Sequence, residues 1–165
     1  MPVDTELNQS RRQLQLTELL TPARIRIPLV SSTKDAILAE LVDVVVANAT
    51  VRDPEKVLEA VREREEVLST GIGSGVAIPH GKTSVVDELI LVAGVQPAGV
   101  DFEALDGRAV NLFFMLVGPE SSAGQHVKAL SRISRLLRRD SFRVRLTEAE
   151  TPDQFFSIIA EAEAT

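Results

Sequence analysis

Apolar residues recur at helical spacing in the first part of this chain. Between positions 32 and 48 they return every three or four residues behind Ser and Thr candidates for an N-cap, at Ile37, Leu38, Leu41, Val44 and Val45. This spacing predicts an amphipathic helix. Asp53 and Pro54 then suit the N-cap and the first position of a second helix, which we expect to end near Leu68.

Strand-like segments occupy the middle of the chain. GVAI, LILVAGVQ and AVNLFFMLVG are short, rich in β-branched or aromatic residues, and bounded by Gly, Pro or Asp. The last two are nearly continuous apolar runs, as expected for strands that are covered on both faces. RIRIPLV, at 24–30, alternates at period two before Pro28 and predicts a short strand at a sheet edge.

Helical spacing returns after these strands. SSAGQHVKALSRISRLLRR and SFRVRLTEA each predict a helix, Thr151 and Pro152 open a last one, and LTELL near the start predicts a brief helical turn. Helices before and after a central block of strands predict a single α/β domain, with a mixed central β-sheet flanked by helices on both faces. We expect this domain to span 15–165 behind a loose polar tail at 1–14.

Composition narrows the class of protein. The length of 165 residues suits one domain with a sizeable core, and a net charge of −6 gives no overall basic footprint for nucleic acid. An acidic protein favours basic partner surfaces. The absence of cysteine excludes disulfides, zinc–cysteine sites and thiol nucleophiles. No signal-peptide core or run of about 18 uncharged apolar residues occurs, so we expect a cytoplasmic protein without membrane insertion.

GSGVAIPHGKT, at 73–83, raises the question of a nucleotide loop. A P-loop needs four residues between its glycines, whereas Gly75 and Gly81 enclose five, and Pro79 removes a backbone donor. The glycines before it follow a G-x-G-x-G order rather than G-x-G-x-x-G, and Ser74 does not lie in G-x-S-x-G. The two histidines have no recognisable metal-ligand spacing. Nucleotide, serine-hydrolase and metal sites are therefore disfavoured.

His80 follows an apolar segment, Val76–Ile78, that we expect to be a buried strand. Pro79 before it fixes the chain direction, and Gly81 after it allows close backbone approach. Rigid mounting of this kind suits a reactive side chain. The alternative is a histidine that only caps the strand.

His126 lies one turn before Leu130 on the line continued by Ile133 and Leu137, so we expect it to face inward. With Ser121 or Ser122 as N-cap, it would lie near the positive end of its helix, where a phosphate is stabilised. The alternative is a core histidine that is hydrogen-bonded to the backbone.

Arg64 occupies a helix position where the stripe of Val57, Val61 and Leu68 predicts another apolar residue. A guanidinium directed toward the sheet would bind phosphate oxygens through two hydrogen bonds. The alternative is an arginine whose apolar stem lies on the core while its head reaches water. His80, His126 and Arg64 together are consistent with a phosphoryl site, although spacing alone does not show that they meet.

The segment REREEVLSTGIGSGVAIPHGK resembles the type-2 enzyme IIA domains of the bacterial phosphoenolpyruvate-dependent phosphotransferase system, the fructose/mannitol class that includes nitrogen-regulatory enzyme IIA. The resemblance runs from about Leu16 to the final helix and implies the mannitol-type enzyme IIA fold. It implies that His80, in PHG, accepts the phosphoryl group. It matches His126, in GQHVKAL, to the histidine that orients or stabilises this group, and Arg64, in REEVLST, to the arginine that neutralises its charge.

The resemblance also implies partners. The donor would be phosphorylated HPr or its nitrogen-branch counterpart, the acceptor would be a IIB domain on the way to a sugar, and neither ATP, metal nor another cofactor would be required. The alternative is a nitrogen-regulatory protein, in which phosphorylation of His80 changes a docking surface for a target protein and no sugar is served. Ser74 stands where many relatives have asparagine, and we expect Lys82 and Thr83 to be bystanders.

Overall fold

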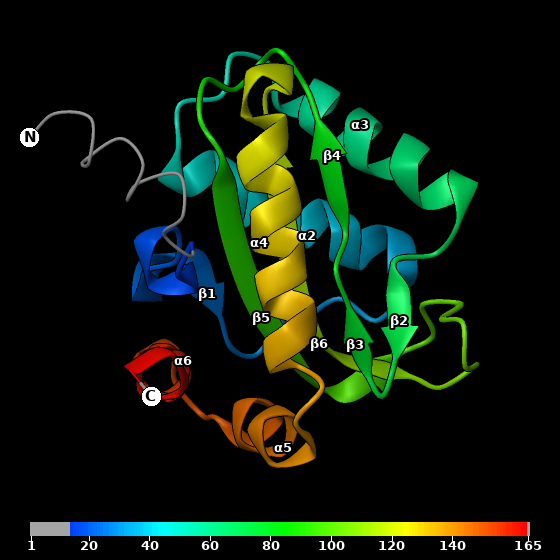
Figure 1. Ribbon diagram of the computed structural model, residues 1–165. Coiled ribbons are helices and arrows are strands. Elements are labelled where there is room, and N and C mark those ends of the chain that lie inside the picture. Colours follow the sequence, from blue (N-terminus) through cyan, green and yellow to red (C-terminus); the bar gives the residue numbers. More distant parts are fainter. Residues whose placement is uncertain (1–13, 165) are drawn as a thin grey trace, which may run out of the picture.

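A mixed six-stranded sheet forms the centre of the computed structural model, which describes residues 14–164 (Figure 1). Its strands are β1 (Ile25–Arg26), β2 (Gly71–Gly73), β3 (Val76–Ala77), β4 (His80–Lys82), β5 (Ile90–Val100) and β6 (Val110–Gly118). The order along the sheet is β1-β5-β6-β3-β2, and β4 also pairs with β6. β5 and β6 are antiparallel, as are β2 and β3, whereas the β1–β5, β3–β6 and β4–β6 pairs are parallel.

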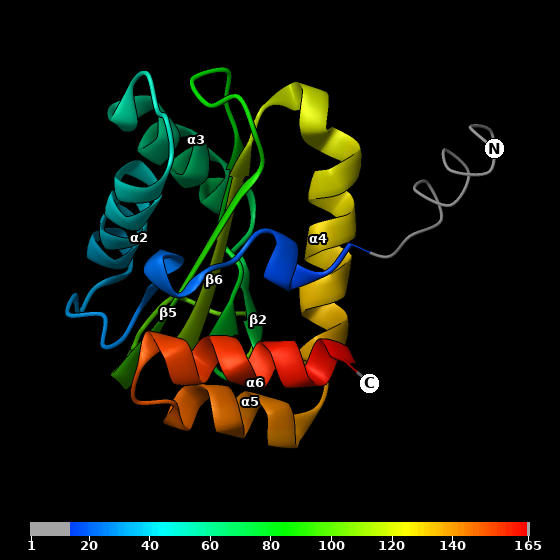
Figure 2. The same cartoon turned by 90° about the vertical axis from the view of Figure 1, so that its left-hand side faces the viewer.

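Helices cover both faces of this sheet. The α-helices are α2 (Lys34–Asn48), α3 (Pro54–Val67), α4 (Ala123–Leu136), α5 (Asp140–Glu148) and α6 (Pro152–Ala164), and the 3-10 turns are η1 (Leu16–Glu18), η2 (Pro22–Arg24) and η3 (Glu120–Ser122). Figure 2 shows α2 and α3 on one side of the sheet and α4 on the other, with α5 and α6 side by side across one end. The predicted α/β architecture is confirmed.

The apolar run of β6 explains how one strand serves two cores. Leu112, Phe114 and Leu116 join the apolar cluster formed with α4, α5 and α6. Their neighbours along the strand, Phe113, Met115 and Val117, join the cluster formed with α2 and α3. Because successive side chains of a strand point to opposite faces, a strand with a helix layer on each side needs apolar residues at nearly every position.

Most predicted elements are confirmed, with some local differences. β1 lies at the sheet edge as expected, and the hydroxyl of Thr33 caps α2 by accepting the Ala36 N–H at 3.2 Å. Asp53 occupies the N-cap position of α3, but its side chain makes no capping hydrogen bond. Thr151 caps α6 by accepting the Gln154 N–H at 3.1 Å.

The tail expected at 1–14 falls on residues 1–13 and the first described residue, so it stays a prediction, as does the domain boundary at 15. Among residues 14–164, no helix is both long enough and apolar enough to cross a bilayer.

Candidate functional site

β4 presents His80 at its first position, beside the end of β6. Its backbone is fixed by the parallel register that pairs His80 with Leu116, and the Leu116 N–H donates to the Pro79 carbonyl at 3.0 Å. The ring Nδ1 lies 2.9 Å from the carbonyl oxygen of Ile78. A carbonyl only accepts hydrogen bonds, so this contact places the proton of the neutral ring on Nδ1 and leaves the lone pair on Nε2. The result is a half-buried imidazole with Nε2 available as a nucleophile.

Gly81 is required by the packing of α3 against β4. A Cβ at this position would lie 3.1 Å from the carbonyl carbon of Ala60 and from the nitrogen of Val61, both in the backbone of α3. The expected close approach at Gly81 is confirmed, and its partner is the helix that carries Arg64.

His126 lies on the buried side of α4, where its side chain is only 2% exposed. The prediction that it faces inward is confirmed, and its ring centroid lies 5.5 Å from that of His80 with an interplanar angle of 66°. Within the described part of the chain, neither ring nitrogen has a hydrogen-bond partner. The alternative of a histidine bonded to the backbone is therefore wrong. A buried polar group without a partner is unusual in a native protein and suggests a ligand that is present only part of the time.

Burial lowers the pKa of His126 to about 4, and the positive charges of His80 and Lys82 add to this effect. His126 is therefore neutral near pH 7. A neutral imidazole offers one N–H donor and one acceptor. It can donate a hydrogen bond to an anionic group next to His80 without introducing a buried charge.

Arg64 is only partly buried, so the expectation that it lies on the buried stripe of α3 is wrong. The buried side of α3 consists of Val57, Val61 and Glu65, while Leu68, expected on the same stripe, is 57% exposed. The actual spacing is four residues each time, which places position 65 rather than 64 against the core. Arg64 lies on the adjoining partly exposed face, and its Nη1 donates to the Leu68 carbonyl at 2.8 Å.

Charges on two elements, α3 and β4, act on His80. Its pKa is lowered, primarily by burial, and the positive charges of Arg64 and Lys82 lower it further. The hydrogen bond with Ile78 and the negative charge of Glu65 act in the opposite direction. His80 is therefore neutral near pH 7 and lies among positive charges that favour a bound anion.

Lys82 is a site residue that the sequence interpretation missed. The sequence interpretation makes it a bystander, yet its charge lowers the pKa of both histidines. The available signal was its position two residues after His80, since residues i and i+2 of a strand point to the same face.

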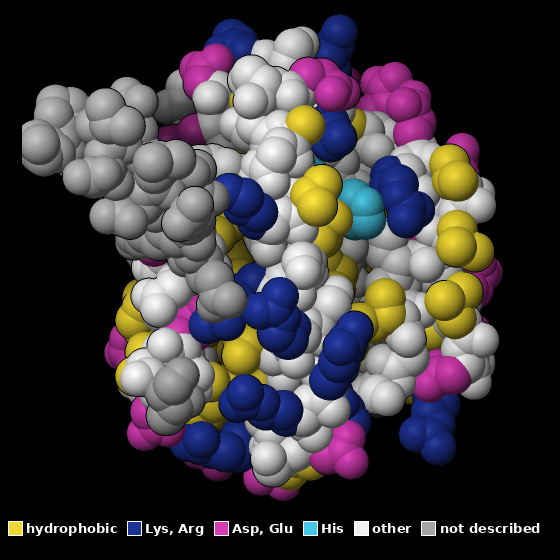
Figure 3. Space-filling model, viewed as in Figure 1, with side chains coloured by type: hydrophobic (Ala, Val, Ile, Leu, Met, Phe, Trp, Pro, Cys, Tyr) yellow, Lys and Arg dark blue, Asp and Glu magenta, His cyan; other side chains and the backbone are white. Residues whose placement is uncertain are grey.

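Exposed apolar side chains border the site. Val67 and Leu68 follow Arg64 at the end of α3 and are 81% and 57% exposed, and Val127, next to His126 on α4, is 63% exposed. Figure 3 shows histidine, hydrophobic and basic side chains together on one face of the molecule. Such a face suits a transient protein contact better than enclosure of a small molecule. No group of three or more metal-ligating side chains occurs in residues 14–164.

Comparison with known proteins gives one consistent result. Residues 18–162 match the family described as "Phosphoenolpyruvate-dependent sugar phosphotransferase system, EIIA 2". The chain is 40% identical over 146 residues to the "PTS system fructose-specific EIIABC component" of Bacillus subtilis. The aligned region covers 88% of this chain and 23% of that protein. The chain is 34% identical over 152 residues to the "Nitrogen regulatory protein" of Bradyrhizobium diazoefficiens, which covers 92% of this chain and 99% of that protein.

Solved structures agree with this match. Nitrogen regulatory protein IIA-Ntr from Neisseria meningitidis superposes with a TM-score of 0.81 at 28% identity, over 87% of this chain and 98% of that one. IIA mannitol from Escherichia coli superposes with a TM-score of 0.73 at 21% identity, over 85% and 98% respectively.

Proposed function

The chain belongs to the type-2 enzyme IIA family of the phosphoenolpyruvate-dependent sugar phosphotransferase system, and on this premise we propose that it is a phosphoryl carrier whose acceptor is His80. The observation that carries the proposal is the pairing of two imidazoles. Nδ1 of His80 is occupied by the Ile78 carbonyl, so Nε2 keeps its lone pair, and the neighbouring His126 has both ring nitrogens unpartnered among the described residues.

The transfer requires no proton movement on the acceptor. The Nε2 lone pair of neutral His80 forms a bond to phosphorus while the N–P bond of a phosphohistidine donor breaks, and that electron pair returns to the donor ring. Nδ1–H of His80 keeps its bond to the Ile78 carbonyl throughout. In-line transfer of this kind depends chiefly on alignment and on stabilisation of the phosphoryl oxygens.

Three neighbours provide that stabilisation. The N–H of neutral His126 donates to a phosphoryl oxygen, and this supplies the partner that its ring otherwise lacks. Arg64 and Lys82 contribute positive charge near the acceptor, since both lower the pKa of His80. Arg64 acts from the edge of the site, where its Nη1 donates to the Leu68 carbonyl before the phosphoryl group arrives.

The exposed apolar residues beside His80 indicate that both partners are proteins. We assign the donor as an HPr-type phosphocarrier and the acceptor as a IIB domain in sugar uptake. Mannitol IIA from Escherichia coli, which shares this fold, has been solved in a complex with phosphorylated enzyme IIB. Val67, Leu68 and Val127 would form the apolar part of the shared docking face.

A second candidate function is nitrogen regulation, in which phosphorylation of His80 controls binding to a target protein and no sugar is served. The observation in its favour is the higher structural similarity to IIA-Ntr, with a TM-score of 0.81 against 0.73 for the mannitol protein. The same site chemistry serves both functions. They differ in whether a IIB domain removes the phosphate.

The central experiment is incubation with enzyme I, HPr and phosphoenolpyruvate, followed by mass spectrometry. We expect one acid-labile phosphate on the wild-type protein and none on His80→Ala, whereas equal labelling of both would overturn the proposal. His126→Ala should be labelled but should transfer more slowly, and an unchanged rate would remove His126 from the mechanism. Adding a fructose-type IIB domain separates the two functions, because only a transport protein should lose its label to it.

A further inference from the structure

Three glutamates are buried in the described residues, and each accepts backbone N–H groups from a neighbouring segment. Glu40, Glu65 and Glu163 are all 7% exposed. Glu40 binds the N–H groups of residues 30 and 31, and Glu163 binds those of residues 16 and 17. These two contacts join outer segments of the fold. Glu65 differs because the segment that it binds leads to the functional site.

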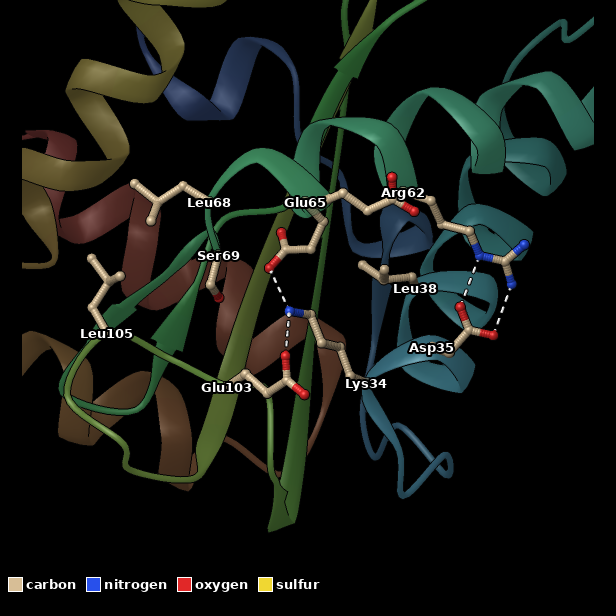
Figure 4. A pocket seen from close by; sticks show the side chains of 10 residues that line it. Lys34, Asp35, Leu38, Arg62, Glu65, Leu68, Ser69, Glu103 and Leu105 are labelled. Carbon is tan, nitrogen blue, oxygen red and sulfur yellow. Dashed lines mark hydrogen bonds and ion pairs between the residues drawn. The ribbon is translucent and has the colours of Figure 1, made fainter.

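The Glu65 carboxylate is held by groups from two directions. It accepts the Thr70 N–H at 3.0 and 3.2 Å and the Thr70 hydroxyl at 2.5 Å. On its other side the ammonium of Lys34 lies 3.0 Å from Oε1 and also 3.9 Å from Glu103 (Figure 4). A buried carboxylate with this many partners is fixed in position.

A hydrogen-bonded path leads from Thr70 to the acceptor histidine. The Thr70 carbonyl accepts the Ile78 N–H at 3.0 Å. The Ile78 carbonyl in turn accepts the Nδ1 proton of His80 at 2.9 Å. Glu65 thus fixes Thr70, Thr70 anchors Ile78, and Ile78 sets the tautomer of the ring.

We propose that Glu65 is a positioning residue which, through Thr70 and Ile78, holds His80 in the Nδ1–H tautomer and so keeps Nε2 free to accept a phosphoryl group. The inference rests on the proposed function, since only an acceptor histidine needs one defined tautomer. Glu65 need not touch the phosphoryl group, and its contribution is made before the donor arrives.

The charge of Glu65 has a second effect on the same ring. The charged and titratable groups that face His80 are Arg64 and Glu65 from α3, Lys82 on β4 and His126 from α4. Glu65 is the anion among them, and it raises the pKa of His80 against burial and the two cations. A higher pKa accompanies stronger nucleophilicity as long as the ring stays neutral at the working pH.

The test is NMR of the imidazole nitrogens in the unphosphorylated protein, for Glu65→Gln and for the matched control Glu163→Gln. Both substitutions remove one buried, ion-paired carboxylate that holds backbone N–H groups. We expect wild type and the control to share the Nδ1–H tautomer and the same titration. Glu65→Gln should show a mixture of tautomers and a lower pKa of His80. If the His80 ring nitrogens of Glu65→Gln had the chemical shifts and the titration of wild type, the proposal would be overturned.

A second variant covers the case in which Glu65→Gln does not fold. Lys34→Met removes the cation beside Glu65 and keeps an apolar stem against the Phe102 ring, over which the ammonium lies at 4.8 Å. With less of its charge neutralised, Glu65 should raise the pKa of His80. A raised pKa of His80 in Lys34→Met would support an electrostatic path from Glu65, and an unchanged titration of His80 would contradict it.

Kinetics then connect the tautomer to transfer. With HPr as donor at pH 7, Glu65→Gln should accept phosphate more slowly by about tenfold to a hundredfold, as expected for a misaligned nucleophile, while Glu163→Gln keeps the wild-type rate. The NMR result does not require phosphorylation. A wild type that is never labelled would refute the proposed function alone, whereas equal rates for the two variants would refute the role of Glu65 alone.

Discussion

Ser74 has a backbone conformation that its side chain does not favour. It lies at φ 57°, between Gly73 at φ 104° and Gly75 at φ 78°, in the turn between β2 and β3. Asp106 supports this turn by accepting the Ser74 N–H at 2.9 Å. Asparagine tolerates the left-handed region better than serine does, so asparagine at this position would fit the turn with less strain.

We predict that Ser74→Asn raises the free energy of unfolding by about 0.5 kcal/mol, because it lowers the cost of the left-handed conformation. Urea denaturation of the unphosphorylated protein measures the change. Ser74→Val provides the contrast, since a β-branched residue at positive φ should destabilise by more than about 1 kcal/mol. Equal free energies of unfolding for Ser74→Val and Ser74→Asn would contradict this prediction, because they would mean that the turn relaxes out of the left-handed conformation.

His126 makes stability depend on pH in a defined direction. Its pKa in the folded protein is about 4, below the value of about 6.5 in an unfolded chain, so the folded state binds fewer protons between these values. Its contribution to stability is complete above pH 6.5 and is lost as the pH falls toward 4. The loss amounts to at most about 3 kcal/mol.

We therefore expect the stability of wild type to fall more steeply between pH 7.5 and 4.5 than that of His126→Gln, which cannot take up this proton. Urea denaturation at the two pH values gives both differences, and carboxylate titration is common to the two proteins. Equal losses of unfolding free energy in wild type and His126→Gln would contradict the prediction, because they would mean that water reaches the His126 ring in the folded state.

The positions of the two histidines could be predicted from sequence, whereas the partial burial of Arg64 could not. Pro79 and Gly81 restrict the backbone around His80, and the stripe through Leu130 places His126, so both positions follow from local rules. On α3 the polar residues at 64 and 65 are one step apart, and periodicity does not say which is buried. Burial of Glu65 depends on the Thr70 N–H and Lys34, which come from other segments.

At the level of elements, the contact between α3 and β4 connects the fold to the site. Since a Cβ at Gly81 would meet the backbone of α3 at 3.1 Å, Gly81→Ala must displace the helix. We predict a loss of about 1–3 kcal/mol in unfolding free energy, as for other overpacked core positions, and slower phosphate acceptance because Arg64 moves with the helix.

Gly124→Ala is the matched control, because nothing lies within 4 Å of a Cβ at that position in α4. Alanine favours the helix, so this variant should be as stable as wild type or slightly more so. Denaturation curves and labelling rates of the two variants give the comparison. Equal stability of both would mean that α3 is not held tightly against β4.

The strands show why some elements escape prediction. β5 and β6 are long apolar runs whose composition alone marks them as buried strands. β2 and β4 consist of Gly71–Gly73 and His80–Lys82, rich in glycine and poor in β-branched residues, so local propensity opposes a strand. They become strands because β3 and β6 supply hydrogen-bonding partners, and that pairing is a property of the whole sheet.

At the scale of the whole molecule, net charge gives a misleading picture of the surface over α4 and α5. The chain carries −6 overall, yet positions 123–145 contain seven basic residues and one acidic residue. Figure 3 shows the basic side chains gathered over α4 and α5, on the face where histidine is exposed. A partner that approaches His80 therefore meets positive charge, and the acidic composition alone would have suggested the reverse.

This distribution makes a prediction about association. A phosphorylated donor carries a negative phosphoryl group, and the exposed basic residues along α4 and at the start of α5 should steer it to the face that carries the histidines. We expect the second-order rate constant of phosphate acceptance to fall as the salt concentration is raised. The double variant Arg135→Glu with Arg139→Glu should lower this rate constant by roughly tenfold at low salt. Rapid quench-flow kinetics with phosphorylated HPr as donor measure both effects.

The control must change net charge equally without touching this face. Lys56→Glu with Arg108→Glu meets the condition, since both residues are exposed and lie on α3 and in the loop before β6. If net charge alone governed the encounter, the two double variants would slow by the same factor and with the same salt dependence. If the face along α4 steers the donor, the variants of Arg135 and Arg139 lose most of the rate and most of its sensitivity to salt, because Coulomb forces act at short range once salt screens them.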